Sequence, residues 1–545
     1  MKKQLLFAGI ILFACASLHA QTWSKIHSIF QANCVTACHG GANPLGQLDL
    51  SGTETDVYNA LIGATPVNPA AQAKNYKLID PGYPHRSFLL RKINNGLDPD
   101  RDIETAEGTL MPPAPQPALS NADIELVSSW ILHGAPQSGD VVDEQAIIDY
   151  YNGMGMSDLA PPPAPDTSEG IQVHFGSIYL AAGEEIEFMK KHEMTSITEN
   201  VEITRLHAFI NGMSHHYLMY KYDTPGDASG TPEGLRTVNI SNPGTNAALV
   251  SGWQDTNDQT LPEGTGYFWE TGAVLDLNYH FLNWSQDSVL KAELYTNIYY
   301  QPKQTNTLEM HSDLYINPST FILNDSQDHI FTDGVFDGSS NETWYVWLLS
   351  SHTHKYGVDY DIFLRNSNGT KGQQVYEGFY DYYYTFNQGY YEWEHPAIRY
   401  FEPALVVPLN EGFIHEATFN NDGPVPVSFG LTTDDEMMLM FVQYTTEDFS
   451  VGLSENEKEK ESFKVYPNPA SDATSILFKL EESSNLKIEL YELLGKKVAH
   501  VASRNFEAGN HVINMDTEKL GLSPGFYLVK MKTNEKISTQ KLVVH

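Results

Sequence analysis

The chain has 545 residues, a formal net charge of −36 and a pI of about 4.8. Its length predicts about three or four domains of ordinary size. The negative charge repels nucleic acid and anionic membranes, so it argues against a DNA- or RNA-binding role. Aromatic side chains make up 12% of the residues, which favours β-sheet.

Residues 1–20 are expected to be a signal peptide. Lys2 and Lys3 precede an apolar run that ends at Leu18 and is too short for a membrane anchor. Cleavage is expected after Ala20. The alternative is a lipoprotein signal with Cys15 as the lipidated residue. The rest of the sequence has no run long enough to predict a membrane span.

Two cysteines remain beyond this leader, Cys34 and Cys38, and His39 follows the second one. Haem is attached in c-type cytochromes through Cys-x-x-Cys-His, in which the histidine ligates the iron. Here the spacing is one residue longer. The motif therefore predicts covalent haem, with a small Cys34–Cys38 disulfide loop or a metal clip as the alternatives.

Downstream residues support the haem interpretation. Met111 lies in a proline-flanked loop, and a methionine thioether is the usual second axial ligand of cytochromes c. Residues 119–131 follow as an amphipathic helix with Ser120 as its expected N-cap. Residues 21–145 resemble the cytochrome c domains fused to other bacterial enzymes. The resemblance implies haem c held by Cys34, Cys38 and His39, with Met111, or less favourably His85, in the sixth position.

A proline-rich linker is expected at 146–169, where residues 161–165 favour an extended polyproline II spacer. From 170 to 447, short β-rich segments are broken by Gly, Pro, Asn and Asp, which predicts β-sandwiches. This length suits two sandwiches better than one, so we expect them at 170–308 and 309–447.

Four short segments of the sandwich region carry candidate metal ligands. His352 and His354 lie two residues apart at the end of an apolar run, so on a strand both would point to the same side. Each segment also has a structural explanation, such as a polar strand face, a buried core histidine or a packing methionine. Together the segments supply imidazoles and a thioether, a set that suits copper. The candidates are His215, His216, His280, His352, His354 and Met437.

With these ligands in this order, residues 170–447 resemble the copper type II, ascorbate-dependent monooxygenases, the family of peptidylglycine α-hydroxylating and dopamine β-monooxygenases. The stretches at 393–396 and 435–437 also match. The resemblance implies two coppers facing each other across a solvent-filled cleft. His215, His216 and His280 would bind the one that relays electrons. His352, His354 and Met437 would bind the catalytic one, where O2 reacts.

The sequence departs from that family in three respects. The sandwich region has no cysteine, whereas the animal enzymes carry disulfides there. Ser350 stands where the peptide-hydroxylating members have an arginine that pairs with a substrate carboxylate. Phe441 stands where they have a substrate-contacting tyrosine. We therefore expect the copper sites to carry over, and a peptide substrate not to.

Residues 448–462 are expected to be a charged, solvated linker. Residues 463–545 resemble the C-terminal sorting domain of type IX secretion cargo, with Pro467 and Pro469 near the start and Gly525 and Tyr527 near the end. The resemblance implies the type IX secretion machinery as a partner. It also implies export through the periplasm to a secreted or cell-surface location.

The sequence thus predicts a multidomain protein: a small α-helical cytochrome c domain, two jelly-roll-like β-sandwich copper domains and a small β-sandwich sorting domain. The expected activity is hydroxylation of a small organic substrate by O2, with two coppers and one haem c. Electrons would come from an ascorbate-like reductant or a redox protein, with the haem as a proposed route to the coppers. The alternatives are a non-catalytic copper-binding or sequestering protein and an electron-transfer protein.

Overall fold

A computed structural model describes residues 21–449 except 37, 212, 239–245, 379–392 and 394, and much of 463–544. In the latter part, 467–469, 471–472, 481–482, 493–495, 518, 524 and 534–536 are excluded. The expected signal peptide and nearly all of the expected charged linker lie outside the described residues. The chain divides into two compact units, Met1–Phe449 and Ser450–His545.

The N-terminal part of the first unit is helical and rich in loops. Its core is built around Trp23, whose ring stacks on that of Trp130 with centroids 5.1 Å apart. The Ser120 side chain accepts a hydrogen bond from the backbone N–H of Asp123, which confirms the expected N-cap. The α-helices are α1 (Thr22–Phe30), α2 (Glu54–Leu61), α3 (Pro69–Ala73), α4 (Phe88–Ile93), α5 (Asn121–Leu132) and α6 (Glu144–Asp149).

Two sheets follow. The first is six-stranded, in the order β1-β10-β3-β8-β11 with β7 also paired to β3, and the second has the order β5-β2-β9-β4-β6. The strands of the first sheet are β1 (Gly170–Leu180), β3 (Val201–Ile210), β7 (Asn257–Thr260), β8 (Thr265–Trp269), β10 (Leu290–Pro302) and β11 (Leu308–Glu309). Those of the second are β2 (Glu185–Glu193), β4 (Ser214–Lys221), β5 (Arg236–Thr237), β6 (Ala248–Trp253) and β9 (Val274–Leu282).

Strands after residue 310 pair in two further four-stranded sheets, β12-β21-β15-β18 and β14-β19-β16-β17, and a short pair, β13-β20. We refer to the two earlier sheets as the first sandwich and to these as the second sandwich. Its strands are β12 (His311–Ile316), β13 (Phe321–Ile322), β14 (Asp328–Val335), β15 (Thr343–His352), β16 (Gly357–Arg365), β17 (Lys371–Glu377), β18 (Ile398–Pro408), β19 (Phe413–Asn420), β20 (Val427–Ser428) and β21 (Leu439–Thr445).

The two sandwiches share both apolar and polar contacts. The core of the first sandwich continues into Trp347 and Leu348 of β15. Buried Gln443 of β21 donates hydrogen bonds to Ser251 Oγ at 3.1 Å and to Tyr267 Oη at 2.8 Å. Because buried polar groups are costly to leave unpaired, this network favours one relative placement of the two sandwiches.

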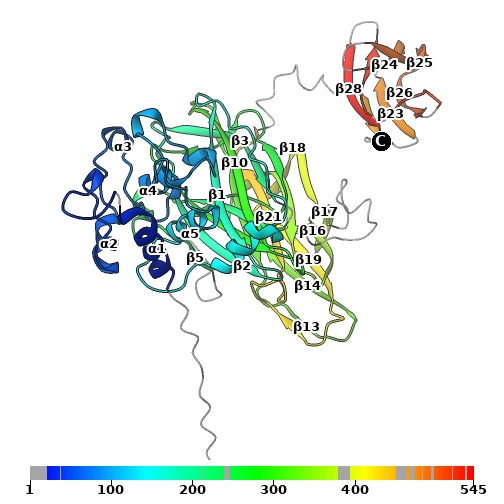
Figure 1. Cartoon of the computed structure of the whole chain (residues 1–545). Helices are drawn as coiled ribbons and strands as arrows, with labels where there is room; N and C mark the ends of the chain where they lie inside the picture. Colours follow the sequence, from blue (N-terminus) through cyan, green and yellow to red (C-terminus); the bar gives the residue numbers. More distant parts are fainter. Residues whose placement is uncertain are drawn as a thin grey trace, which may run out of the picture. The chain divides into compact units, whose positions relative to one another are not determined.

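The helical part packs against β1 (Figure 1). The expected linker lies along the first sandwich, because Met156 N donates to Val289 O at 2.9 Å and Gln172 Nε2 to Pro162 O at 3.0 Å. Helix α6 runs through the boundary expected at residue 145. The proline-rich stretch is therefore anchored to the sheet at these points.

The second unit is a small all-β module of two sheets, β22-β23-β26 and β25-β24-β27-β28. Its core includes Ile488 and Val529. Its strands are β22 (Phe463–Tyr466), β23 (Ala473–Leu480), β24 (Ser484–Glu492), β25 (Lys497–Phe506), β26 (Gly509–Asp516), β27 (Gly525–Lys532) and β28 (Ile537–Val544). Throughout the described part of the chain, every helix is too short or too polar to cross a membrane.

Candidate metal centre

Five histidines from three segments of the chain meet where the two sandwiches face each other. The ring of His215 lies 4.4 Å from that of His280, 5.1 Å from that of His352 and 4.8 Å from that of His354, measured between centroids. The ring of His216 lies 4.9 Å from that of His280. We call these residues the histidine cluster. Expected ligands of both coppers are thus brought together.

A β-bulge lets two adjacent histidines of β4 reach the cluster. Neighbouring residues on a regular strand point to opposite faces. The pairing of β4 with β9 shifts register between Ser214 and His216, so His215 is the extra residue, and His216 pairs directly with His280. A bulge re-aims a side chain in this way.

The second sandwich contributes its residues from strand ends. His352 is the last residue of β15, His354 follows in the next turn, and Met437 lies just before β21. The buried Glu436 carboxylate accepts the backbone N–H groups of His354 and Met437, each at 3.1 Å, and that of Tyr356 at 2.8 Å. Glu436 therefore ties together the two backbone segments that carry these expected ligands.

Hydrogen-bond acceptors around the histidine cluster orient three of its rings. His280 Nε2 lies 2.7 Å from Glu185 Oε1, His216 Nε2 lies 2.8 Å from Asn278 Oδ1, and His354 Nδ1 lies 3.1 Å from Asp435 O. Each acceptor requires a proton on the nitrogen that it contacts, which leaves the other ring nitrogen with a free lone pair. A hydrogen bond from the ring nitrogen that does not bind the metal is typical of metal-ligating histidines.

Four ring nitrogens in the cluster are buried and have no hydrogen-bond partner among the described residues: His215 Nε2, His280 Nδ1, His352 Nε2 and His354 Nε2. Burial lowers the pKa of each ring, that of His354 to about 4. The imidazoles are therefore neutral near pH 7, the form that binds metals. A buried nitrogen without a hydrogen-bond partner destabilises the folded protein unless it binds a ligand. These residues therefore fit a metal ion.

The donor atoms do not divide into two separate triads. One atom each from His215, His216 and His352 lies within 4.8 Å of the others, and a second such group joins Glu187, His216 and His280. The resemblance implied triads separated by a solvent-filled cleft. In this structure the two sandwiches bring the triads into contact.

The carboxylates that support the histidine rings were not predicted from the sequence. Burial disfavours charge on Glu185, but hydrogen bonds from His280 and Thr433 lower its pKa to about 2. Thr433 belongs to the second sandwich, so Glu185 connects both sandwiches. Glu185 and Glu187 alternate on β2, but that spacing alone does not reveal that β2 lies beside β9.

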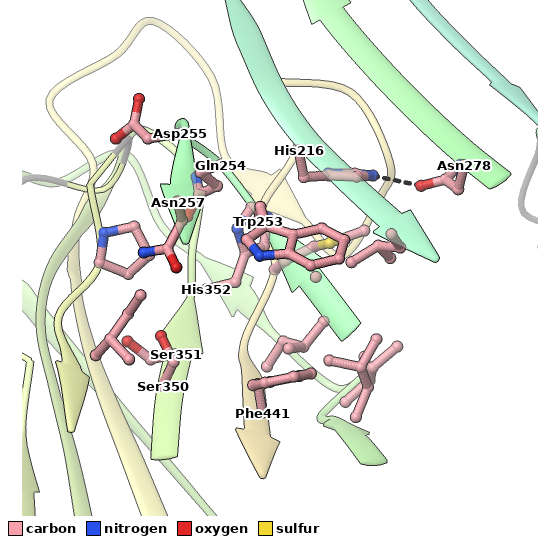
Figure 2. A pocket seen from close by; sticks show the side chains of 18 of the residues that line it. His216, Trp253, Gln254, Asp255, Asn257, Asn278, Ser350, Ser351, His352 and Phe441 are labelled. Atoms are coloured by element: carbon pink, nitrogen blue, oxygen red, sulfur yellow. Dashed lines mark hydrogen bonds between the residues drawn. The ribbon is translucent and has the colours of Figure 1, made fainter. Parts of the chain in front are cut away.

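A pocket of about 680 Å³ opens beside the cluster. His216, His352 and Met437 form part of its wall, together with side chains from both sandwiches. Figure 2 shows His216 and His352 at this wall, with Trp253 and Phe441 nearby. An expected metal site thus borders a space large enough for an organic ligand.

The expected haem residues lie in the helical part. Cys34 is in the one-turn helix η1 (Gln31–Val35), and both it and Cys38 are free thiols. Burial and the neighbouring Cys38 raise the pKa of Cys34 to about 11. His39 Nδ1 lies 3.2 Å from Leu48 O, which leaves Nε2 free to bind a metal. This donor set fits covalent haem attachment.

The two candidates for the sixth haem position lie in different surroundings. Met111 packs against the same helical core as Cys34, and its N–H donates to Lys92 O at 2.7 Å. His85 lies in the short helix η3 (Pro84–Arg86), facing the ring of Tyr83. Met111 as the sixth haem ligand stays a prediction.

The comparison with protein families matches one segment. Residues 464–545 match the family described as "Secretion system C-terminal sorting domain". The C-terminal module is a sorting domain of type IX secretion, and the protein is exported to a secreted or cell-surface location. No curated protein matches the chain.

Solved structures give weak likenesses. The major capsid protein P2 of bacteriophage PM2 has 9% identity and a TM-score of 0.23, covering 51% of this chain and 97% of its own. The β-glucuronidase of Faecalibacterium prausnitzii has 11% identity and a TM-score of 0.15, covering 45% and 47%. That of Dictyoglomus thermophilum has 11% identity and a TM-score of 0.14, covering 45% and 44%. The chain thus spans less than half of either glucuronidase, and these scores carry no functional argument.

Proposed function

We propose that residues 170–447 form a copper-dependent monooxygenase that hydroxylates a C–H bond of an organic molecule with O2. One oxygen atom would enter the substrate and the other would leave as water, with two electrons and two protons supplied from outside. Bound copper would supply the O2-activating redox chemistry. The observation that carries the proposal is the set of unpartnered ring nitrogens beside a ligand-sized pocket.

The chain's own residues would hold and shield this chemistry. His216, His352 and Met437 border the pocket, so a molecule bound there would lie next to the expected ligands. Glu185 and Glu436 would keep ring and backbone positions fixed. Apolar walls would limit water around the reacting C–H bond, which suppresses side reactions.

We further propose that the helical part carries haem c on Cys34 and Cys38, with His39 as an axial ligand, and passes electrons to the copper centre. The free thiols and the orientation of His39 support this. Chemically reduced haem in the copper-loaded chain should then be reoxidised under O2. Haem that stays reduced under those conditions would contradict the electron path.

The first experiment is to measure iron and copper in the purified chain, then O2 uptake with an ascorbate-like reductant. Met437→Leu removes the thioether, while Met440→Leu changes a buried core methionine of β21 in the same way. We expect about two coppers and one haem iron per chain. Loss of one ligand should lower reductant-dependent O2 uptake about tenfold or more in Met437→Leu alone. A chain without copper would exclude the monooxygenase.

A second candidate is non-catalytic copper binding, favoured by the contact between the two triads. Closed coordination by the cluster would leave no position for O2. In that case the chain would bind copper tightly and consume no O2 with any reductant. The same pair of measurements therefore separates the two functions.

A further inference from the structure

The charge of the wall limits which ligands suit the pocket beside the histidine cluster. Among its described lining residues there is no lysine or arginine. In the copper-free chain an anionic ligand would therefore lose its hydration without gaining a lysine or arginine partner, which is costly in a partly enclosed site.

The two carboxylates of the wall already have partners. Glu187 Oε1 accepts a hydrogen bond from Asn278 Nδ2 at 2.9 Å and lies 3.5 Å from His216 Nε2. Asp255 Oδ2 lies 3.1 Å from His395 Nε2. The carboxylates of the wall thus repel anions. Because both already have partners, they do not favour a cationic ligand either.

Most of the wall is apolar and comes from both sandwiches. Trp253 and Leu218 belong to the first sandwich, and Leu348, Ile398 and Phe441 to the second. Aromatic and aliphatic walls of this kind gain free energy mainly by burying apolar ligand surface. The body of the ligand should therefore be hydrocarbon.

One side of the pocket is polar and carries neutral amide groups. Figure 2 shows Gln254 and Asn257 close together on that side, near Asp255. Gln254 Nε2 donates to Trp393 O at 3.3 Å, which fixes the orientation of its amide. Neutral amides pair well with a hydroxyl or carbonyl group.

From these observations we propose that the pocket takes an uncharged organic molecule with an apolar body and one hydrogen-bonding end. This assignment of substrate class rests on the proposed function for turnover, while binding itself requires neither copper nor O2. The hydrogen-bonding end would face Gln254 and Asn257. The apolar body would lie toward Phe441 and the metal-facing wall.

The test is calorimetric titration of the copper-free full chain with three probes on one skeleton: 4-tert-butylbenzyl alcohol, 4-tert-butylbenzoate and 4-tert-butylbenzylamine. We expect the alcohol to bind about tenfold or more tightly than the carboxylate, because no cation offsets the desolvation of the anion. The alcohol should also bind more tightly than the amine. A carboxylate that binds as tightly as the alcohol, or an amine that binds more tightly, would overturn the assignment, as would no binding at all.

Two pairs of variants locate the binding. Ile398→Trp fills the pocket from β18, whereas Val406→Trp alters an exposed position of the same strand that does not line it. Only the first should abolish binding of the alcohol. Asp255→Lys places a cation at the polar side, and Glu263→Lys makes the same charge change at an exposed position outside the wall. Only the former should strengthen carboxylate binding, by about tenfold.

Failure of this inference differs from failure of the proposed function. If copper is absent but the alcohol binds and Ile398→Trp blocks it, the pocket assignment holds without the monooxygenase. If copper is present and O2 is consumed but the neutral probe does not bind, the substrate class is wrong. Binding that Val406→Trp weakens as much as Ile398→Trp would place the probe elsewhere and overturn the inference.

Discussion

Glu185 is the residue through which the expected metal centre depends on both sandwiches. Its carboxylate lies 2.7 Å from His280 Nε2 and accepts from the N–H of Thr433 at 2.9 Å. The first contact sets which nitrogen of His280 is free, and the second holds the loop that leads to Met437. Glu185 is therefore a positioning residue for ligands on both sides.

We expect Glu185→Gln to weaken copper binding about tenfold, because hydrogen-bond partners of metal-bound histidines contribute on that scale. Glu184→Gln at the adjacent position is the control, since that side chain accepts from Ala181 N instead. Copper titration of the apo-protein measures both. Equal copper affinity in Glu185→Gln and the parent chain would show that His280 is not held through this carboxylate.

At the scale of single elements, local sequence predicted some features and not others. The cap of α5 follows from Ser120 and the apolar periodicity after it, because both act within one helix. The bulge in β4 was not predicted, since it depends on how Ser214 and His216 pair with β9. The sequence therefore suggested ligands but not how two neighbours could share one face.

The cap of α5 gives a prediction for this element. Ser120→Ala should lower the free energy of unfolding of the helical part by about 1 kcal/mol, because the N–H of Asp123 loses its acceptor. Asn121→Ala, at the exposed first residue of the helix, should change it by much less. Urea unfolding followed by circular dichroism compares them. Equal losses in the two variants would argue against a capping role.

At the scale of the whole unit, the helical part and the first sandwich approach closely at Gly82. A Cβ atom at Gly82 would lie 2.1 Å from Glu233 O, and the residue has a φ of +81°. Neighbouring Tyr83 donates to Glu233 Oε2 at 3.0 Å, and Arg86 Nη1 to Glu193 Oε2 at 3.0 Å. Only glycine allows the two backbones to meet in this way.

We expect Gly82→Ala to separate the helical part from the sandwich. Gly63→Ala is the control, since Gly63 also has a positive φ, +66°, but nothing lies within 4 Å of its added Cβ. The control should lower the free energy of unfolding by about 1 kcal/mol, from backbone strain alone. Gly82→Ala should lower the free energy of unfolding by more than this and should expose the interface to limited proteolysis. Equal cleavage of the two variants would contradict the close approach.

The same interface should respond to pH through His174 of β1. Burial lowers its pKa, but the carboxylates of Asp100, 3.7 Å from Nδ1, and of Glu293, 3.5 Å from Nε2, with a further contribution from Asp98, outweigh this and raise the pKa to about 9. A raised pKa stabilises the fold fully below the unfolded value of about 6.5. That contribution is lost as the pH rises through about 9.

The advantage of the parent chain over His174→Gln in free energy of unfolding should therefore shrink between pH 6.5 and 9. The same substitution at His329, which pairs with Asp325 near the surface of the second sandwich, is the control. Urea unfolding at intervals across this range measures both. A difference that stays constant with pH would show that His174 is not charged in the folded protein.

The sequence by itself determined the features that act locally or by composition. Alternation and turn residues indicated the β-rich region, capping chemistry indicated α5, and the landmarks after residue 463 indicated the sorting domain, which the family match confirms. The candidate ligands were also visible, because their residue types are unusual at such spacing. Copper, haem and oxidative activity stay predictions.

Only the tertiary structure decided how distant segments meet. It placed the ring centroids of His215 and His354, which are far apart in the chain, 4.8 Å from each other. It also gave Glu185 a hydrogen-bond partner in each sandwich. It also lined the pocket with side chains from both sandwiches and without lysine or arginine among its described residues. Strand order and sandwich packing arise from burial summed over many residues, so no single stretch of sequence specifies them.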